Sequence, residues 1–241
     1  MFSKVFLSAH WQNLIMANYA VDVDILKKHV PNGTELDLWN DQAFVSLVGF
    51  QFWNTRLLGL PIPFHQNFEE VNLRFYVRYK SDTEGWKRGA VFFKEIVPKP
   101  MITLVANGVY GEHYQTLKMK HSVEKMDNSL NVKYLWKYKN HWNSLSVTAD
   151  ALAKPIPEGS EAEFIAEHYW GYTQISDKKT SEYQVAHPRW RAHEVHNFDI
   201  NCQFDKLYGS EFGHLATATP TSVFMAEGSD VEVLKRQILK R

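Results

Sequence analysis

The sequence predicts a β-rich α+β protein, in which an antiparallel sheet or barrel carries a few helices to one side. Apolar and polar residues alternate with a period of two along much of the chain, as they do in half-buried strands. These segments follow one another at short spacing, and only two or three stretches carry helix signals, which argues against alternating β-α units. With 241 residues, of which 44% are hydrophobic, the chain fits one domain, residues 1–241, with a sizeable core.

The clearest strand is predicted at residues 71–79, where apolar residues from Val71 to Tyr79 alternate with Asn72, Arg74 and Arg78 among others. Because successive side chains of a strand point to opposite faces, this strand should have one apolar and one polar face. The stretch NVKYLWKYKNHW, residues 131–142, repeats the pattern with its lysines on one face. A solvated strand face explains these lysines without a nucleic-acid ligand.

Two nearly continuous apolar runs, residues 44–53 and 89–97, predict strands that are covered on both faces. Shorter patterns predict further strands at residues 14–21, 145–151, 182–187, 191–198 and 222–227.

Two helices are predicted from their capping signals. Asp22 can cap a helix that runs through His29 and is closed by Pro31. Ser160 and Glu163 have the spacing of a capping box at the start of a second helix. The stretch KPIPEGSE, residues 154–161, is interpreted as a loop within the single domain because the strand pattern resumes beyond it.

Composition argues against several classes of partner. Lysine plus arginine equals aspartate plus glutamate, 27 each, so we expect neither nucleic acid nor a membrane surface as a partner. The amino-terminal residues do not resemble a signal peptide, which predicts a cytoplasmic protein. The single cysteine, Cys202, agrees with this compartment and is interpreted as a core residue. No motif for a cofactor is found, no metal site is expected, and the sequence leaves a homo-oligomer open.

The stretch FFKEIVPKP, residues 92–100, places charges inside and after an apolar run. In a regular strand Lys94 and Glu95 would point to opposite faces, so at least one charge would be buried. A buried charge must be paired or neutralised. Glu95 could pair with Arg74 or Arg78 on a neighbouring strand, or Lys94 or Glu95 could meet a ligand in a cavity.

Lys99 lies between Pro98 and Pro100, which hold its backbone at the end of that strand. A lysine in this position could act as an amine nucleophile. To do so near neutral pH its pKa would have to fall from about 10.4 to about 6, which asks for roughly 6 kcal/mol of desolvation or like-charge repulsion.

Several stretches closely resemble the YqjF-like bacterial proteins, an uncharacterised family of the acetoacetate decarboxylase-like superfamily. They are VDVDILKKHVPNGTELD, FVSLVGFQF, TRLLGLPIPFHQNFEEVNLRFYVR, RGAVFFKEIVPKP, EHYWGYT, HPRW and FMAEGSDVEV. The resemblance covers nearly the whole chain and implies a cone-shaped antiparallel β-barrel enclosing a small-molecule pocket. It also aligns Lys99 with the lysine that forms an imine in the decarboxylase. The lysine that activates it there is replaced here by Pro100.

Three functional hypotheses follow from these observations. The first is an enzyme acting on a small carbonyl or carboxylate compound, with a lyase-like activity on a keto acid as the first candidate. In it Lys99 is the amine, Glu95 the general acid or base and Arg74 the anchor for a carboxylate. The second is a binding protein for an apolar ligand. The third is an enzyme that uses the acid-base or metal chemistry of histidines, with His65, His168 and His187 as candidates from three separate segments. The candidate catalytic residues are Lys99 and Glu95, and the candidate ligand-binding residues are Arg74, Lys94, His65, His168 and Trp170.

Overall fold

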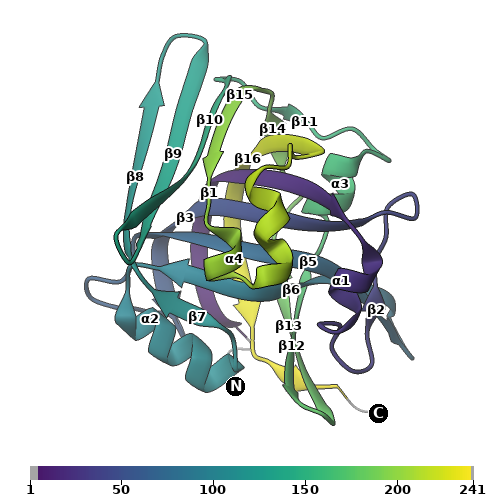
Figure 1. Ribbon diagram of the computed structural model, residues 1–241. Helices are drawn as coiled ribbons and strands as arrows, with labels where there is room; N and C mark the ends of the chain where they lie inside the picture. The colour runs from purple at the N-terminus through teal and green to yellow at the C-terminus, as the bar shows by residue number, and fades with distance from the viewer. Residues whose placement is uncertain (1–4, 240–241) are drawn as a thin grey trace.

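The computed structural model describes residues 5–239 and consists mainly of strands, as the sequence predicts (Figure 1). The strands are β1 Val5–Val21, β2 Glu35–Leu36, β3 Ala43–Leu57, β4 Leu60–Pro61, β5 Phe68–Ser81, β6 Gly85–Val97, β7 Tyr114–Thr116, β8 Lys118–Lys125, β9 Ser129–Tyr138, β10 His141–Asp150, β11 Lys154–Pro155, β12 Trp170–Ser176, β13 Lys179–Ala186, β14 Arg191–His193, β15 Val195–Asn201, β16 Ser222–Leu234 and β17 Gln237–Ile238. The helices are α1 Val23–Lys27, α2 Pro100–Val105, the π-helical turn η1 Ala106–Tyr110, α3 Glu161–Ala166, α4 Phe204–Leu207 and the 3₁₀ helix η2 Ser210–Ala216.

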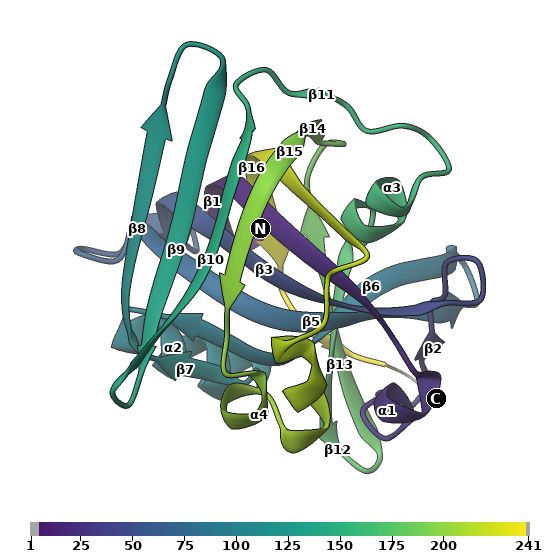
Figure 2. The ribbon, with the colours of Figure 1, turned by 45° about the horizontal axis from the view of Figure 1, so that its top comes forward.

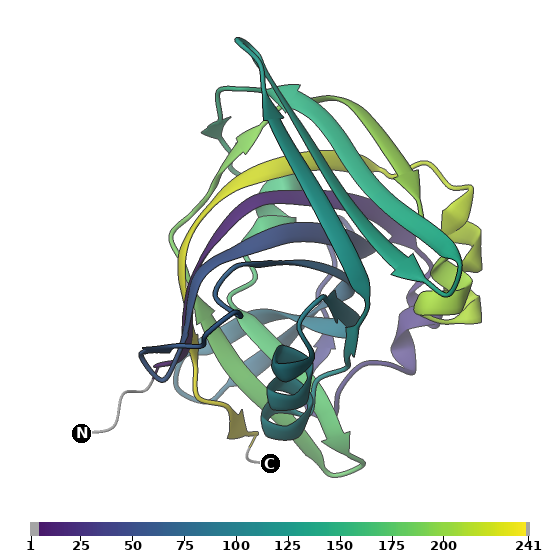
Figure 3. The same cartoon turned by 90° about the vertical axis from the view of Figure 1, so that its left-hand side faces the viewer.

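The larger sheet curves around an interior (Figure 3). Its strands are hydrogen-bonded in the order β16-β1-β3-β5-β6-β12-β13. The path returns to its start because β13 also pairs with β16, through Val185 opposite Val233. One correction applies to the predicted antiparallel arrangement: β12 and β7 both run parallel to β6, so the sheet is mixed.

The smaller sheet, in the order β15-β10-β9-β8, packs against the outside of the larger one (Figure 2). Tyr134 and Trp136 of β9 are fully buried in a core cluster that also contains Leu47 and Leu73 of the larger sheet. Helix α4 and η2 add Phe204 and other apolar side chains to the same cluster. The prediction of a single domain stays a prediction, and this shared core supports it.

The polar face of β5 points into the interior rather than into solvent. The strand predicted at residues 71–79 is confirmed within β5. Asn72 and Tyr76 are nevertheless buried, and Arg74 is half-buried. The curved sheet encloses this part of the face, so Asn72, Arg74 and Tyr76 point to the inside of the molecule.

A bulge in β6 changes the expected pleat. Leu73 of β5 is opposite Lys94, but the next residue, Arg74, is opposite Phe92. The extra residue, Phe93, therefore shifts the alternation by one position. Phe92 and Glu95 consequently face the same interior space, whereas a regular strand would place them on opposite faces.

Both predicted helix caps are confirmed. Asp22 accepts a hydrogen bond from the backbone N–H of Asp24, and Ser160 accepts one from Glu163. Helix α1 ends earlier than expected, at Lys27. The Glu163 carboxylate accepts from the backbone of Gly159, so the reciprocal bond of the capping box is shifted by one residue.

Helix α2 and the π-helical turn η1 were not predicted. Pro100 occupies the first position of α2, where its fixed φ and missing N–H suit a helix start. Gly111 ends η1 in the left-handed conformation, with φ of 72°. None of the helices in the described part of the chain has the length and apolar character of a membrane-spanning helix.

Close packing of β12 on β13 gives a first prediction. A Cβ atom at Gly171 would lie 2.2 Å from Cζ of Tyr183, so the variant Gly171→Ala should lower the free energy of unfolding by about 1–3 kcal/mol. Urea denaturation measures the change. The control is Gly108→Ala, where a Cβ would meet open space. If both variants changed the free energy of unfolding by an equally small amount, the close contact between Gly171 and Tyr183 would be contradicted.

Candidate functional site

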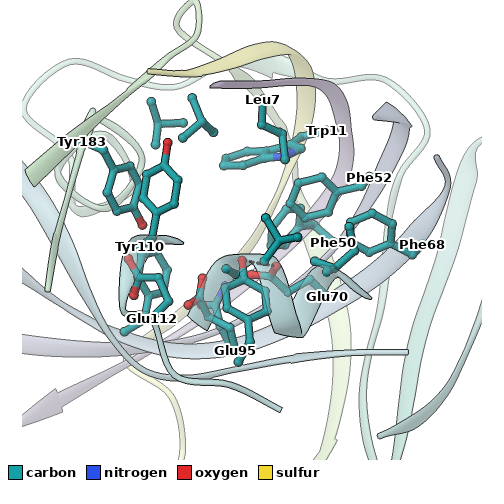
Figure 4. Close-up of a pocket in the computed structure, with 18 of the residues that line it drawn as sticks. Leu7, Trp11, Phe50, Phe52, Phe68, Glu70, Glu95, Tyr110, Glu112 and Tyr183 are labelled. Carbon is teal, nitrogen blue, oxygen red and sulfur yellow. Dashed lines mark hydrogen bonds between the residues drawn. The ribbon is translucent and has the colours of Figure 1, made fainter. Parts of the chain in front are cut away.

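A cavity of about 120 Å³ lies inside the curve of the larger sheet (Figure 4). Helix α2 and η1 contribute Ile102, Val105 and Tyr110 to its wall. Most of the remaining wall is apolar and comes from β1, β3, β5 and β13; it includes Leu7, Trp11, Leu14, Val48, Phe50, Phe52, Phe68 and Val185. The polar lining residues are Glu70, Asn72, Arg74, Glu95, Tyr110, Glu112, Tyr114 and Tyr183. The cavity therefore has one largely apolar wall and one polar wall.

Three glutamates converge on the polar wall, as Figure 4 shows for Glu70, Glu95 and Glu112. They come from β5, from β6 after its bulge, and from the segment that precedes β7. All three are buried, with exposed fractions of 2%, 3% and 7%. We call them the carboxyl cluster.

Hydrogen bonds satisfy only part of this cluster. Glu70 accepts from Nδ2 of Asn72 at 2.9 Å and from the hydroxyl of Tyr114 at 3.0 Å. Glu112 accepts from Oγ1 of Thr173 at 2.8 Å. By contrast, Oε2 of Glu95 is buried and has no hydrogen-bond partner among residues 5–239.

Burial makes the cluster much less acidic than exposed carboxyl groups. It raises the pKa of Glu70 to about 7, against the hydrogen bonds from Asn72 and Tyr114. Burial likewise raises the pKa of Glu112 to about 7. The pKa of Glu95 is raised well above the usual value by burial and by the neighbouring carboxylates. Burial therefore favours the protonated form of Glu95, while Glu70 and Glu112 can hold or release a proton near neutral pH.

Two tyrosines complete the polar wall as hydrogen-bond donors. Burial and the nearby carboxylates raise the pKa of Tyr114 and of Tyr183 well above the usual range. Both phenols therefore keep their protons at neutral pH. Tyr183 also packs edge-on against Tyr110, with ring centroids 5.1 Å apart.

Among the described residues that line the cavity, Arg74 is the one cationic residue, and a row of polar side chains holds it in place. Its Nε donates to the hydroxyl of Tyr76 at 3.3 Å, and its Nη2 lies 3.8 Å from Sδ of Met16. Tyr76 donates to Ser46 at 2.7 Å, and Ser46 donates to Oδ1 of Asn18 at 2.6 Å.

This row follows the register of the sheet. Arg74, Ser46, Asn18 and Ser222 are directly opposite one another on β5, β3, β1 and β16. Nδ2 of Asn18 donates to Ser222 at 2.9 Å. Every donor points the same way, from Arg74 toward Ser222. We call this row, including Tyr76, the polar ladder.

The two lysines of residues 92–100, Lys94 and Lys99, lie outside the cavity lining. Lys99 is half-buried and immediately precedes α2. Lys94 is half-buried beside the bulge, and burial lowers its pKa. The ion pair of Glu95 with Arg74 or Arg78 is absent from the described residues, and Arg78 pairs with Glu35 at 2.7 Å instead.

The predicted histidines do not line the cavity either. His65 is held in the loop before β5 by a 2.8 Å contact between Nδ1 and the carbonyl of Pro63. His168 is buried, with Nε2 3.1 Å from Oδ2 of Asp37. Burial lowers the pKa of His168 to about 4, against the hydrogen bond to Asp37, so its ring is neutral at pH 7. The ring of His187 stacks on that of Trp190, with the ring centroids 4.0 Å apart.

Trp170 also lies outside the cavity lining, where Nζ of Lys87 sits 4.1 Å from its ring centre. Within residues 5–239 no three His, Cys, Asp or Glu side chains are placed to hold a metal ion. The candidates that the structure brings together are Glu95 and Arg74.

Sequence reasoning missed Glu70, Glu112, Tyr114 and Tyr183. The adjacent residues Glu69 and Glu70 are both buried. Glu69 faces away from the cavity lining and contacts Nδ1 of His121 at 3.2 Å. The polar side of β5 was the available signal for Glu70. This side of the strand faces the interior only because the sheet closes on itself.

Comparisons with known proteins agree with the fold and with the resemblance noted in the sequence. The "Uncharacterized protein YqjF" of Bacillus subtilis (strain 168) is 34% identical over 187 residues, which cover 75% of this chain and 72% of that protein. Acetoacetate decarboxylase from Legionella pneumophila has a similar fold, with a TM-score of 0.66 at 11% identity over 98% of this chain and 87% of that one. The enduracididine biosynthesis enzyme MppR, solved with pyruvate, also has a similar fold. Its TM-score is 0.66 at 14% identity, over 100% of this chain and 92% of that one.

The resemblance to YqjF-like proteins is thus confirmed, and the strand-rich fold is that of acetoacetate decarboxylase-like proteins. A family model described as "Uncharacterized conserved protein" matches residues 8–230. This chain therefore belongs to the DUF2071 family.

Proposed function

We propose that this protein binds a small carbonyl or carboxylate compound in the cavity and transfers protons to and from it through the carboxyl cluster. In this proposal the closed path of strands acts as a cone-shaped barrel around the ligand. The observation that carries the proposal is Glu95: its Oε2 is buried on the cavity wall with no partner among the described residues. A buried polar atom without a partner costs free energy, and a ligand group would recover it.

A neutral Glu95 can donate a hydrogen bond to a carbonyl oxygen of the ligand. A carboxyl group kept protonated by an apolar site is a known way to stabilise the negative charge that develops on such an oxygen. Glu70 and Glu112, with pKa values of about 7, suit a general base near neutral pH. The proposed reaction removes a proton from the carbon next to the carbonyl group and returns it there or elsewhere.

The enzymes of similar fold support a small carbonyl ligand, since one of them was solved with pyruvate. Lys99 would have to enter the cavity for the imine chemistry that the resemblance implies. A lysine-based lyase on a keto acid is therefore the rival mechanism, and the experiment below separates the two.

The aromatic wall favours a second candidate, a non-catalytic binding protein for an apolar ligand. Trp11 packs edge-on against Phe50 and Phe52, with ring centroids 4.9 Å and 5.5 Å away. Such a wall binds apolar groups through buried area alone. In the proposal above this wall holds the body of the ligand while the carboxyl cluster meets its carbonyl group.

The variant Glu95→Gln tests the proposed acid. In D₂O the wild-type protein should catalyse exchange of the protons next to the carbonyl of at least one ketone in a panel of acetophenone, cyclohexanone and 2-pentanone, followed by NMR. Because the amide cannot deliver a proton, Glu95→Gln should lower that rate by roughly 10²-fold or more.

The matched control is Glu69→Gln, which changes a buried glutamate of the neighbouring strand outside the cavity lining and should leave the rate unchanged. Equal rates in wild type and Glu95→Gln would refute the role of Glu95. A ligand-dependent adduct on Lys99 after borohydride reduction would establish the imine mechanism instead.

The pKa of Glu112 predicts how stability depends on pH. An unfolded glutamate titrates near 4.5 and the folded one near 7, so between these values the folded state binds more protons. The contribution of Glu112 to stability therefore falls as pH rises through this window and levels off above it. A difference of this size between the unfolded and folded pKa corresponds to roughly 3 kcal/mol of stability, shared among the interacting carboxyl groups.

The variant Glu112→Gln removes this contribution, and its difference from wild type cancels the titration of distant groups. By urea denaturation, the stability of the variant relative to wild type should rise between pH 5 and pH 8. A difference that is the same at both pH values would contradict the raised pKa.

A further inference from the structure

We infer that the cavity selects an uncharged carbonyl compound over a carboxylate of the same shape at neutral and higher pH. This inference rests on the proposed function and narrows its substrate class. Sequence reasoning assigned Arg74 as the anchor for a ligand carboxylate. The structure assigns Arg74 a different task, which is to balance a glutamate.

The charges of the lining show why. Among the described residues that line the cavity, three are glutamates, one is arginine, and none is lysine or histidine. Burial raises the pKa of Glu70, and the positive charge of Arg74 opposes part of that rise, so the guanidinium favours a carboxylate that the protein itself supplies. One ionised glutamate together with Arg74 leaves the described lining without net charge.

A ligand carboxylate would disturb this balance. It would bring a second negative charge into a site where burial already opposes ionisation of the glutamates. An uncompensated buried charge is costly. An uncharged carbonyl compound avoids that cost and still offers an acceptor to Glu95.

The polar ladder limits the reach of Arg74 toward a ligand. Its Nε donates a hydrogen bond to the hydroxyl of Tyr76, and its guanidinium carbon lies 5.5 Å from the centre of the Tyr76 ring. Tyr76 is itself fixed by Ser46 and Asn18, which are fully buried. A guanidinium forms its strongest pair with a carboxylate through two parallel N–H groups. The side-on pair, made by Nε and Nη2, is therefore closed to a ligand carboxylate while Nε of Arg74 donates to Tyr76.

Lower pH should weaken the selection. Once Glu70 and Glu112 are protonated, no carboxylate offsets the charge of Arg74, since burial favours the protonated form of Glu95 as well and Tyr114 and Tyr183 are neutral. A carboxylate ligand then finds a net positive cavity. The preference for the uncharged compound should therefore shrink as pH falls below about 7, the pKa of Glu70 and Glu112.

The test compares ligands that differ only in charge, by isothermal titration calorimetry on the whole chain. The pairs are benzoylformamide with benzoylformate, and 2-oxohexanamide with 2-oxohexanoate. At pH 8 we expect the amide of at least one pair to bind at least tenfold more tightly than its acid. At pH 5.5 the ratio of the affinity for the amide to the affinity for the acid should be at least threefold lower than at pH 8.

The outcomes separate the inference from the proposed function. An acid that binds as tightly as its amide at pH 8 overturns the inference and leaves the carbonyl site standing. Failure of both pairs to bind at either pH, with the chain folded, counts against the proposed function and the inference together.

A pair of matched variants tests the part played by the polar ladder. Tyr76→Phe removes the hydroxyl that holds Arg74, so the affinity for the acid should rise at pH 8 and the amide-to-acid ratio should fall severalfold. Tyr134→Phe is the control: Tyr134 is equally buried, and its hydroxyl donates to the carbonyl of Asn13 at 2.9 Å, away from the ladder.

The ratio in Tyr134→Phe should match wild type, although this variant also loses a hydrogen bond of a buried tyrosine. An unchanged ratio in Tyr76→Phe would show that the ladder does not restrain Arg74. If Tyr76→Phe does not fold, Ser46→Ala removes the acceptor of Tyr76 and is expected to change the ratio in the same direction.

Discussion

The desolvation of three carboxyl groups is the constraint on which this account of the site depends. Glu70, Glu95 and Glu112 lie together in an interior that is otherwise largely apolar. Water would keep them ionised and the interior does not, so the protein must either protonate them or balance them. Both effects are present, because burial favours the protonated form of Glu95, while the charge of Arg74 opposes part of the rise in the pKa of Glu70. The site is thereby equipped with an acid and with groups that can act as bases at neutral pH.

The fold supplies the positions of these groups through two features of the larger sheet. Pairing of β13 with β16 closes the path of strands, which turns the polar side of β5 inward. The bulge in β6 then brings Glu95 to the same side as Phe92. Without the closed path the polar residues of β5 would be solvated, and without the bulge Glu95 would point away from the cavity. In the polar ladder, side chains that are directly opposite one another on β5, β3, β1 and β16 form a row of hydrogen bonds that starts at Arg74. The pairing of these strands therefore positions a charged residue as well as the apolar core.

Much of the fold could be predicted from the sequence because strand alternation and helix capping are local signals. Residues 71–79 alternate clearly, and Asp22 and Ser160 cap the helices that they were expected to cap. The site could be predicted only in part. Glu95 and Arg74 were identified because a charge inside an apolar strand needs an explanation. Glu112 and Tyr183 gave no local signal, since they meet the cluster only through long-range pairing, and the bulge at Phe93 is not visible in the alternation itself.

Titration of the Glu95 carboxyl group gives the sharpest check on this site. It can be followed by carbon-13 NMR of selectively labelled glutamate, with the signal assigned by Glu95→Gln. The account predicts that this carboxyl is still protonated at pH 7 and loses its proton only at higher pH, as its buried and partly unsatisfied environment requires. A carboxyl that titrates near 4.5, like an exposed glutamate, would contradict it. In that case Glu95 could not serve as the acid, and the choice of an uncharged ligand would lose its physical basis.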